Sequence, residues 1–222
     1  MRVLVGCECS GVVREAFRRF GHDAWSCDIK PAEDGSHYHI RRDVRLVMND
    51  GWDLGIFHPV CRYLTNSGAK HLYLGMRKEN GPNEERWRLM RDGADFYLEC
   101  WQAPIDRVAV ENPIWHRAAA EYIQAKATIP HPVKRQFVQP WWFGHLEVKA
   151  TGWALRGLPA LMPTNDVRAE TYALPYAERA KVHYASPGPN REANRSRTLH
   201  GLGDAMAMQW GGEVAQMSLF AA

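Results

Sequence analysis

The sequence lacks long hydrophobic runs, and their absence excludes proteins that span a membrane. No stretch of the 222 residues approaches the roughly eighteen consecutive apolar residues that a membrane helix needs. The opening residues 1–6 also form too short an apolar run for a secretory signal peptide. We therefore expect a protein of the cytoplasm that has no membrane partner.

Paired cysteine motifs are also lacking. The five cysteines are an odd number and include no Cys-x-x-Cys pair: they are Cys7, Cys9, Cys27, Cys61 and Cys100. A disulfide framework or a structural zinc site would need paired spacing. His37 and His39 stand close together without a matching second pair, and we interpret them as loop histidines. The sequence therefore predicts reduced thiols and no metal.

A strong net charge is absent as well, since the formal net charge is only +3. Acidic and basic residues nearly balance over residues 1–111, whereas basic residues outnumber acidic ones over residues 113–200. Nucleic-acid-binding proteins carry basic surfaces of this kind. The second half is compatible with a DNA partner, and equally with a solvated surface that binds nothing.

The first thirty residues have the pattern of a strand, a turn and a helix. Residues 2–6 are β-rich, and the apolar residues of 13–20 recur at helical spacing. The turn at residues 6–11 is small enough for backbone amides to approach a ligand, although a structural turn would look similar. Asp28 closes the second predicted strand, where an acidic residue is expected to bind ribose hydroxyls. We therefore predict a cofactor that contains a nucleoside.

The apolar run at residues 54–57 has the length of a buried parallel strand, and Pro59 cannot continue it. Cys61 is therefore expected just beyond the carboxyl end of the sheet, where open α/β sheets bind ligands. A single cysteine is more often a small buried apolar residue. Its neighbours in the predicted sheet favour a functional role.

A second buried strand, at residues 107–111, ends in the carboxylate of Glu111 and is followed by Asn112 and Pro113. A long amphipathic helix with core residues between Trp87 and Trp101 precedes it. Cys61 and Glu111 are thus expected at the same edge of one sheet. A carboxylate beside a nucleophilic thiol is suited to attacking a ring while protonating it.

These motifs, in this order, resemble the cytosine-C5 DNA methyltransferase family, and more closely its small phage-type members. The resemblance rests on the turn at residues 6–11, Asp28, Asp43, the Pro59-x-Cys61 loop, Glu111-Asn-Pro, Arg195-Ser-Arg197 and Gly203-Asp-Ala-Met206. It implies an α/β fold: a Rossmann-like class I methyltransferase sheet with helices on both faces and a small C-terminal lobe. The expected location is the cytoplasm of a bacterium or of a phage-infected host cell.

The resemblance implies transfer of a methyl or related group from S-adenosylmethionine, or a carboxylated variant of it, to C5 of cytosine in single- or double-stranded DNA. Cys61 would add to C6, Glu111 would bind N3 and the amino group, and Arg195 and Arg197 would complete the catalytic set. The cofactor contacts implied are Cys7, Glu8, Cys9, Ser10, Gly11, Asp28 on the ribose, Ile29, Asp43 on the adenine amino group, Pro59, Asp204 and Ala205.

The chain departs from the family pattern in several places. Val60 stands where a proline usually precedes the nucleophile, Pro113 replaces the valine of Glu-Asn-Val, and Gly203-Asp-Ala-Met replaces Gly-Asn-Ala-Val. There is also little room for a separate target-recognition domain. We expect a catalytic cofactor-binding core over residues 1–130, a small aromatic and basic lobe over 131–190, and a segment over 191–222 that returns to the core. The tryptophans of the lobe would either stack on bases or pack on the sheet.

Three other functions stay open. One is modification of a free deoxycytidine nucleotide, which would explain the short recognition region. Another is that of a DNA-binding relative that has lost catalysis, which the changes at Val60 and Asp204 motivate. A nucleotide-dependent oxidoreductase fits the first turn and acid, but the third glycine of the usual fingerprint is missing. A recognition partner protein and the oligomeric state are left undetermined.

Overall fold

A seven-stranded sheet forms the centre of the fold in the computed structural model, which describes residues 1–112, 114–132, 135–181 and 198–212. The strands are β1 (Arg2–Gly6), β2 (Asp23–Asp28), β3 (His39–Arg41), β4 (Leu54–Phe57), β5 (Arg107–Glu111), β6 (Gln136–Val138) and β7 (Thr151–Arg156). Their order is β3-β2-β1-β4-β5-β7-β6. The first five are parallel, and β7 runs antiparallel to both β5 and β6.

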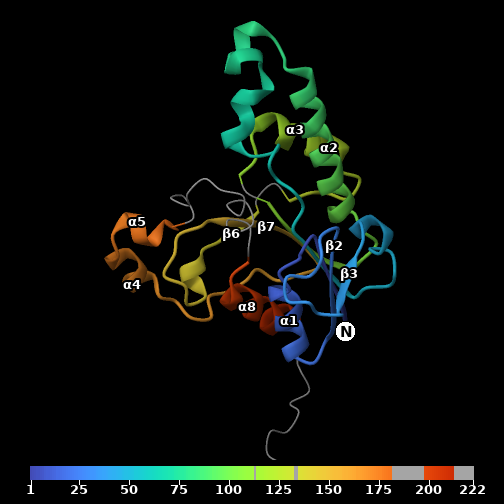
Figure 1. Ribbon diagram of the computed structural model, residues 1–222, viewed down its shortest axis with the longest axis vertical. Coiled ribbons are helices and arrows are strands. Elements are labelled where there is room, and N and C mark those ends of the chain that lie inside the picture. The colour runs from blue at the N-terminus through green and yellow to red at the C-terminus, as the bar shows by residue number, and fades with distance from the viewer. Residues whose placement is uncertain (113, 133–134, 182–197, 213–222) are drawn as a thin grey trace, which may run out of the picture.

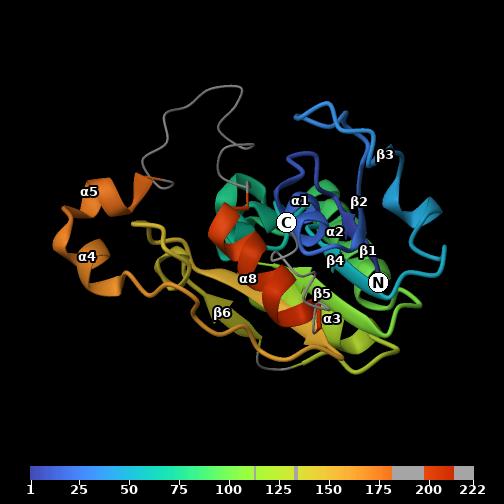
Figure 2. The same ribbon diagram turned by 90° about the horizontal axis from the view of Figure 1, so that it is seen from below.

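Helices cover both faces of this sheet (Figure 1). The helices α1 (Val12–Arg19) and α8 (His200–Trp210) pack together on one face, and α2 (Glu84–Trp101) and α3 (Arg117–Lys126) cover the other. The short helices α4 (Arg168–Ala173) and α5 (Tyr176–Arg179) stand to one side, as Figure 2 also shows. None of the described helices is long and apolar enough to cross a membrane. The order of the strands and the helices on both faces of the sheet confirm the Rossmann-like class I methyltransferase arrangement predicted from the sequence.

The central strands form because their residues are apolar on both faces, as buried parallel strands require. Val3, Val5 and Ile56 lie in the core beneath α1 and α8, whereas Leu4 and Phe57 lie in the core beneath α2 and α3. Successive side chains of a strand point to opposite faces, so each strand contributes to both cores. The predicted strands at residues 2–6, 54–57 and 107–111 all form.

The sheet includes residues that the sequence assigns to a separate lobe. Strands β6 and β7 both fall within residues 131–190, but they pair with the main sheet beside β5. Gly152 allows this close approach, because a Cβ there would collide with the carbonyl oxygen of Asn112. Trp153 is fully buried, so it packs on the sheet, while Trp141 and Trp142 are half-buried. Of the described residues in 131–190, those of α4 and α5 stand apart from the layers (Figure 1).

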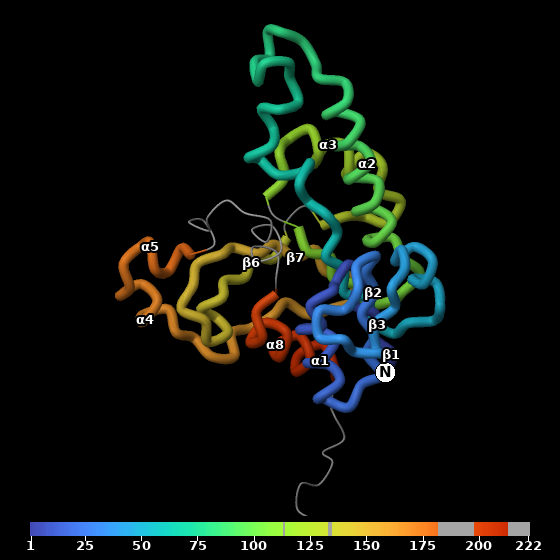
Figure 3. The backbone as a smooth tube through the Cα atoms, in the orientation of Figure 1, coloured from blue at the N-terminus to red at the C-terminus, as the bar shows by residue number. Residues whose placement is uncertain are grey.

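A long excursion at residues 61–83 connects β4 to α2 and projects away from the sheet (Figure 3). The chain of the excursion forms short 3-10 turns: η2 (Asn66–Leu72), η3 (Leu74–Met76) and η4 (Lys78–Asn80). Two further 3-10 turns, η1 (Val44–Leu46) and η5 (Pro140–Trp142), follow β3 and β6. The excursion begins at Cys61, so it starts beside the carboxyl edge of the sheet.

We predict that Trp210→Ala destabilises the protein far more than Met208→Ala on the same helix. Trp210 is fully buried, packs against Trp153 with ring centroids 6.2 Å apart, and donates from Nε1 to the carbonyl of Pro159 at 3.0 Å. Removing such a side chain costs about 3–5 kcal/mol. Met208 is 54% exposed, so its loss should stay within about 0.5 kcal/mol. Urea unfolding measures both; equal losses would contradict this packing.

Candidate active site

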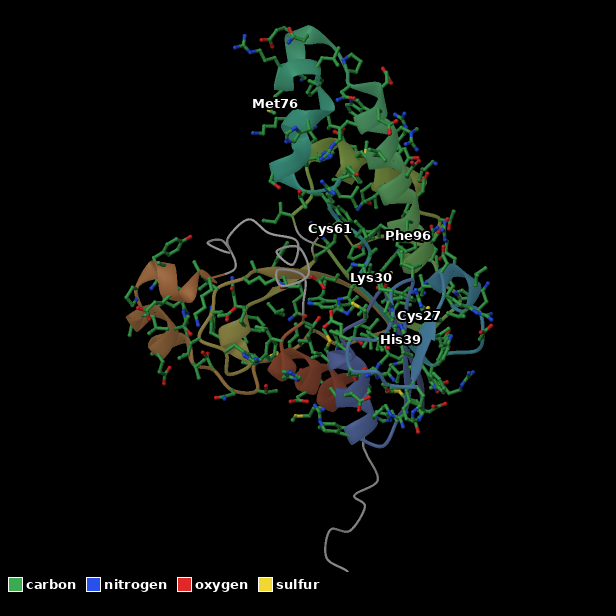
Figure 4. All side chains as sticks on the ribbon, in the orientation of Figure 1. Cys27, Lys30, His39, Cys61, Met76 and Phe96 are labelled. Carbon is green, nitrogen blue, oxygen red and sulfur yellow. The ribbon has the colours of Figure 1, made fainter. Side chains whose placement is uncertain are left out.

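The register of the parallel strands brings the candidate residues to one edge of the sheet. Gly6 at the end of β1 pairs with Cys27 of β2 and with Phe57 of β4, and Phe57 pairs with Val110 of β5. The residues that follow these strand ends therefore meet at the carboxyl edge. Figure 4 shows Cys61 at this edge, between Met76 of the excursion and Cys27.

The turn at residues 6–11 is closed by the chain itself. The amide of Cys7 donates to the carbonyl of Cys27 at 2.7 Å, and both Cys7 and Gly11 adopt positive φ angles of 60° and 73°. Gly11 needs this conformation and has no room for a Cβ, which would collide with the guanidinium of Arg14. The turn therefore holds a fixed shape against the end of β2.

Glu8 occupies the N-terminus of α1. Its buried carboxylate accepts hydrogen bonds from the amides of Val13 at 2.8 Å and Arg14 at 3.3 Å, and from Ser10 Oγ at 3.3 Å. Burial raises the pKa of this carboxyl, and the amide hydrogen bonds oppose that shift. The sequence predicts that helix amides are available to a ligand; those of Val13 and Arg14 are instead used internally.

The residues after β2 and β3 differ in how accessible their groups are. Asp28 is half-buried and accepts from the amide of Lys30 at 2.9 Å, and Ile29 beside it is 71% exposed. The carboxylate of Asp43 is held by Arg45, whose Nε donates at 2.9 Å, and this hydrogen bond lowers the pKa of Asp43. An apolar surface beside a carboxylate thus lies at Asp28 and Ile29, while Asp43 is already paired.

The Cys61 loop is tied to the segment that follows β5. Pro59 is buried, Val60 is 60% exposed and Cys61 is half-buried. The carbonyl of Cys61 accepts from the amide of Leu64 at 2.9 Å, and the carbonyl of Leu64 accepts from the amide of His116 at 2.9 Å. These bonds hold the turn after Cys61 against the chain beyond Glu111.

The other four cysteines have thiols that ionise poorly. Burial raises the pKa of Cys7, Cys9 and Cys100, and it raises that of Cys27 to about 11. A thiolate is the nucleophilic form of cysteine, so these residues are poorly suited to attack a substrate. Cys61 is left as the candidate nucleophile at the edge.

His58 is the site residue that the sequence analysis missed. Its Nδ1 lies 2.6 Å from Oε2 of Glu111. Burial lowers the pKa of His58, but the hydrogen bond to Glu111 and the charges of Glu111 and Glu8 outweigh it, so the net pKa is raised. Burial raises the pKa of Glu111, and the hydrogen bond and charge of His58 reverse this to a net lowering. Each partner therefore stabilises the charged form of the other.

The signal for His58 was present in the sequence. It follows the same strand as Cys61, and the end-of-strand argument that places Glu111 applies to it equally. Lys149, in the segment before β7, also acts on Glu111 by its charge. We refer to Glu8, His58, Glu111 and Lys149 as the charge cluster.

The C-terminal candidates are not brought to this cluster. Asp204 on α8 forms an ion pair with Arg19 at the end of α1, and Ala205 is fully buried in the core. Arg195 and Arg197 lie outside the described residues. The cofactor contacts expected of Asp204 and Ala205 thus gain no support from their positions.

A cleft of about 620 Å³ lies on the excursion, next to the Cys61 loop. Its lining includes Arg62, His71, Tyr73, Asn83 and Arg86. Basic and aromatic side chains of this kind suit phosphates and bases. Within the part of the chain that the structure describes, no group of three or more His, Cys, Asp or Glu is placed to hold a metal ion.

Comparison with known proteins yields only a likeness to solved structures. No protein-family model and no curated protein matches the chain. An E. coli prophage protein described as a DNA modification methyltransferase shares 14% identity at a TM-score of 0.47, over 75% of this chain and 52% of that one. The Entamoeba histolytica methyltransferase EhMeth shares 14% identity at a TM-score of 0.47, over 75% of this chain and 57% of that one. The S. pombe Dnmt2 methyltransferase shares 15% identity at a TM-score of 0.44, over 72% of this chain and 51% of that one.

The chain thus spans about half the length of the solved structures that it matches. Identities and TM-scores this low carry no argument about activity. The function has to be argued from the residues at the carboxyl edge of the sheet.

We predict that the His58–Glu111 pair stabilises the fold most between pH 4.5 and 6.5, the ordinary pKa values of the two groups. The raised pKa of His58 means that its contribution is lost as pH rises through that pKa. The lowered pKa of Glu111 means that its contribution is lost as pH falls through that pKa. Within the window, His58→Gln should cost about 1.5–3 kcal/mol, as for hydrogen bonds to charged groups.

Urea unfolding of the wild type and His58→Gln across this pH range tests the pair. His37→Gln, at an exposed histidine, is the matched control and should show no such window. A difference between wild type and His58→Gln that stays constant with pH would contradict the ion pair.

Proposed function

We propose that this chain is an S-adenosylmethionine-dependent DNA cytosine-5 methyltransferase that acts through a covalent adduct of Cys61. One observation supports the proposal: Glu111 ends β5, and Cys61 lies in the loop after the adjacent parallel strand β4, at the same edge of the sheet. The turn after β1 and the half-buried Asp28 of β2 lie at the same edge. Under this proposal, Cys61 would be the nucleophile, Glu111 the proton-handling carboxylate, and the region at Asp28 the nucleoside-binding part of the site.

The residues beside β1 and β2 fit the cofactor. Ile29 offers an exposed apolar surface for an adenine ring, and the carboxylate of Asp28 can accept hydrogen bonds from ribose hydroxyls. The turn at residues 6–11, with Cys7 at its start, would form the floor of this region. When bound, S-adenosylmethionine supplies an electrophilic methyl group for C5. The contacts of Asp43, Pro59 and the other predicted cofactor-binding residues with S-adenosylmethionine are part of the same proposal.

The residues beside β4 and β5 would prepare the ring. The Cys61 thiolate adds to C6, which breaks the aromaticity and makes C5 nucleophilic. Glu111 accepts a hydrogen bond from the amino group, and a proton delivered through it would neutralise the negative charge that develops at N3. Loss of the C5 proton and elimination of Cys61 complete the reaction. If the substrate is duplex DNA, the base must first leave the stack, at a cost of a few kcal/mol.

Incubation of the protein with S-adenosylmethionine and either DNA or dCMP, followed by mass spectrometry of the nucleosides, tests the substrate. The proposal predicts 5-methylcytosine in DNA. Product from dCMP alone would show that the substrate is a free nucleotide and not DNA. Cofactor binding without product from either substrate would indicate a relative that has lost catalysis.

We predict that Cys61→Ala abolishes methyl transfer and leaves cofactor affinity unchanged, since the thiol acts on the base and not on the cofactor. Cys100→Ala is the matched control, because Cys100 is buried in α2 and its variant should keep activity. Methyl-transfer assays and calorimetric titration measure the two properties. Undiminished transfer by Cys61→Ala would rule out the covalent route.

We predict that Asp28→Ala weakens S-adenosylmethionine binding about 10- to 100-fold, as expected when a hydrogen bond to a charged group is lost. Asp23→Ala is the control, because Asp23 starts the same strand at the opposite edge of the sheet. Calorimetric titration measures both affinities. Equal affinities in the two variants would exclude Asp28 as a cofactor contact.

A further inference from the structure

His58 is held in place beside Glu111 in the charge cluster. It follows β4 directly, and its amide donates to the carbonyl of Gly6 at 3.0 Å. Its ring packs nearly at right angles against Trp153, with centroids 5.5 Å apart and an interplanar angle of 85°. The side chain is only 11% exposed. The imidazole therefore has little freedom to leave this position.

The two nitrogens of the ring have different surroundings. Nδ1 lies 2.6 Å from Oε2 of Glu111, while Nε2 is buried and forms no hydrogen bond with any described residue. The charged groups that act on the ring are Glu111 on β5, Glu8 in the turn after β1, and Lys149 before β7. Two carboxylates against one ammonium favour a protonated imidazole.

The proposed substrate makes two demands on Glu111. The exocyclic amino group of cytosine donates a hydrogen bond, which a carboxylate oxygen can accept. N3 of the neutral ring carries a lone pair, which a carboxylate oxygen would repel. Addition of a thiolate at C6 moves electrons toward N3, so N3 needs a proton at that moment. Glu111 must therefore have access to a proton as well as to its own lone pairs.

We propose that His58 is a positioning residue that orients Glu111 and supplies the proton that Glu111 passes to N3 of the cytosine. This step rests on the proposed function of the same site. At 2.6 Å, Nδ1 and Oε2 are at the short end of charge-assisted hydrogen bonds, so a proton can pass between them without movement of either side chain.

Electrons and protons balance in this step. A lone pair of Cys61 Sγ forms the S–C6 bond, the C5=C6 pair shifts to C4–C5, and the C4=N3 pair moves onto N3. N3 takes a proton from Glu111, and Nδ1 of His58 replaces that proton, which leaves a neutral imidazole. When the S–C6 bond breaks at the end of the reaction, N3 returns its proton by the same route.

The test measures methyl transfer to DNA by the full chain as a function of pH. In His58→Gln the amide can still donate a hydrogen bond to Glu111 but cannot release a proton. We expect kcat to fall on the order of 10²-fold or more, with KM for S-adenosylmethionine unchanged. The wild type should lose activity as pH rises through the raised pKa of His58, and the variant should lack this alkaline limb. His37→Gln should keep both the rate and the profile.

NMR, which needs no turnover, separates failure of the His58–Glu111 pairing from failure of the proton step and of the proposed function. NMR of the imidazole nitrogens should show a protonated His58 in the wild type and a more easily deprotonated one in Glu111→Gln, and circular dichroism checks that each variant is folded. A His58→Gln variant with wild-type kcat and pH profile would overturn the proton step and leave the proposed function standing. A neutral His58 that Glu111→Gln does not affect would overturn the pairing itself. A wild type that methylates neither DNA nor dCMP would overturn the proposed function together with this step.

Discussion

The parallel pairing of β1, β4 and β5 is the constraint on which the site depends. Because Gly6, Phe57 and Val110 share one register across three strands, the next residues of each strand emerge at the same level of the sheet. Buried apolar side chains on both faces hold that register, since a slip by one residue would turn every core side chain toward the wrong face. The positions of Cys61 and Glu111 relative to each other thus follow from core packing.

The same edge gathers charges that would be costly to bury alone, and each is compensated locally. The N-terminus of α1 stabilises Glu8 through the amides of Val13 and Arg14. Glu111 is paired with His58, and both lie near Lys149. A buried carboxylate without such partners would cost several kcal/mol. The charge cluster therefore keeps two acidic groups close to an apolar core while one of them, Glu111, stays 21% exposed to a substrate.

Local sequence patterns allowed most of the helices and strands to be predicted. Elements and contacts that depend on pairing between distant residues were not predicted. The apolar runs of β1, β4 and β5 and the spacing in α2 define their elements without tertiary information. Strand β6 has three residues and β7 has Gly152, a residue depleted in strands, at its second position, so their pairing beside β5 makes them strands. Cys61 and Glu111 were predicted at one edge of the sheet because the sequence marks where the strands before them end. The capping by Glu8 and the pairing of His58 depend on side-chain contacts across 5 and 53 residues, which no local pattern specifies.

The central claim is that Cys61 forms the covalent bond to the base, and the most direct measurement is the identity of the cysteine trapped by 5-fluorocytosine DNA. Fluorine at C5 blocks the final elimination, so the adduct persists and its peptide can be sequenced by mass spectrometry. With S-adenosylmethionine present, the account predicts that the bound nucleotide maps to the peptide containing Cys61 and to none of the other four cysteines. An adduct at another cysteine, or 5-methylcytosine formed in unmodified DNA with no trapped adduct, would contradict it.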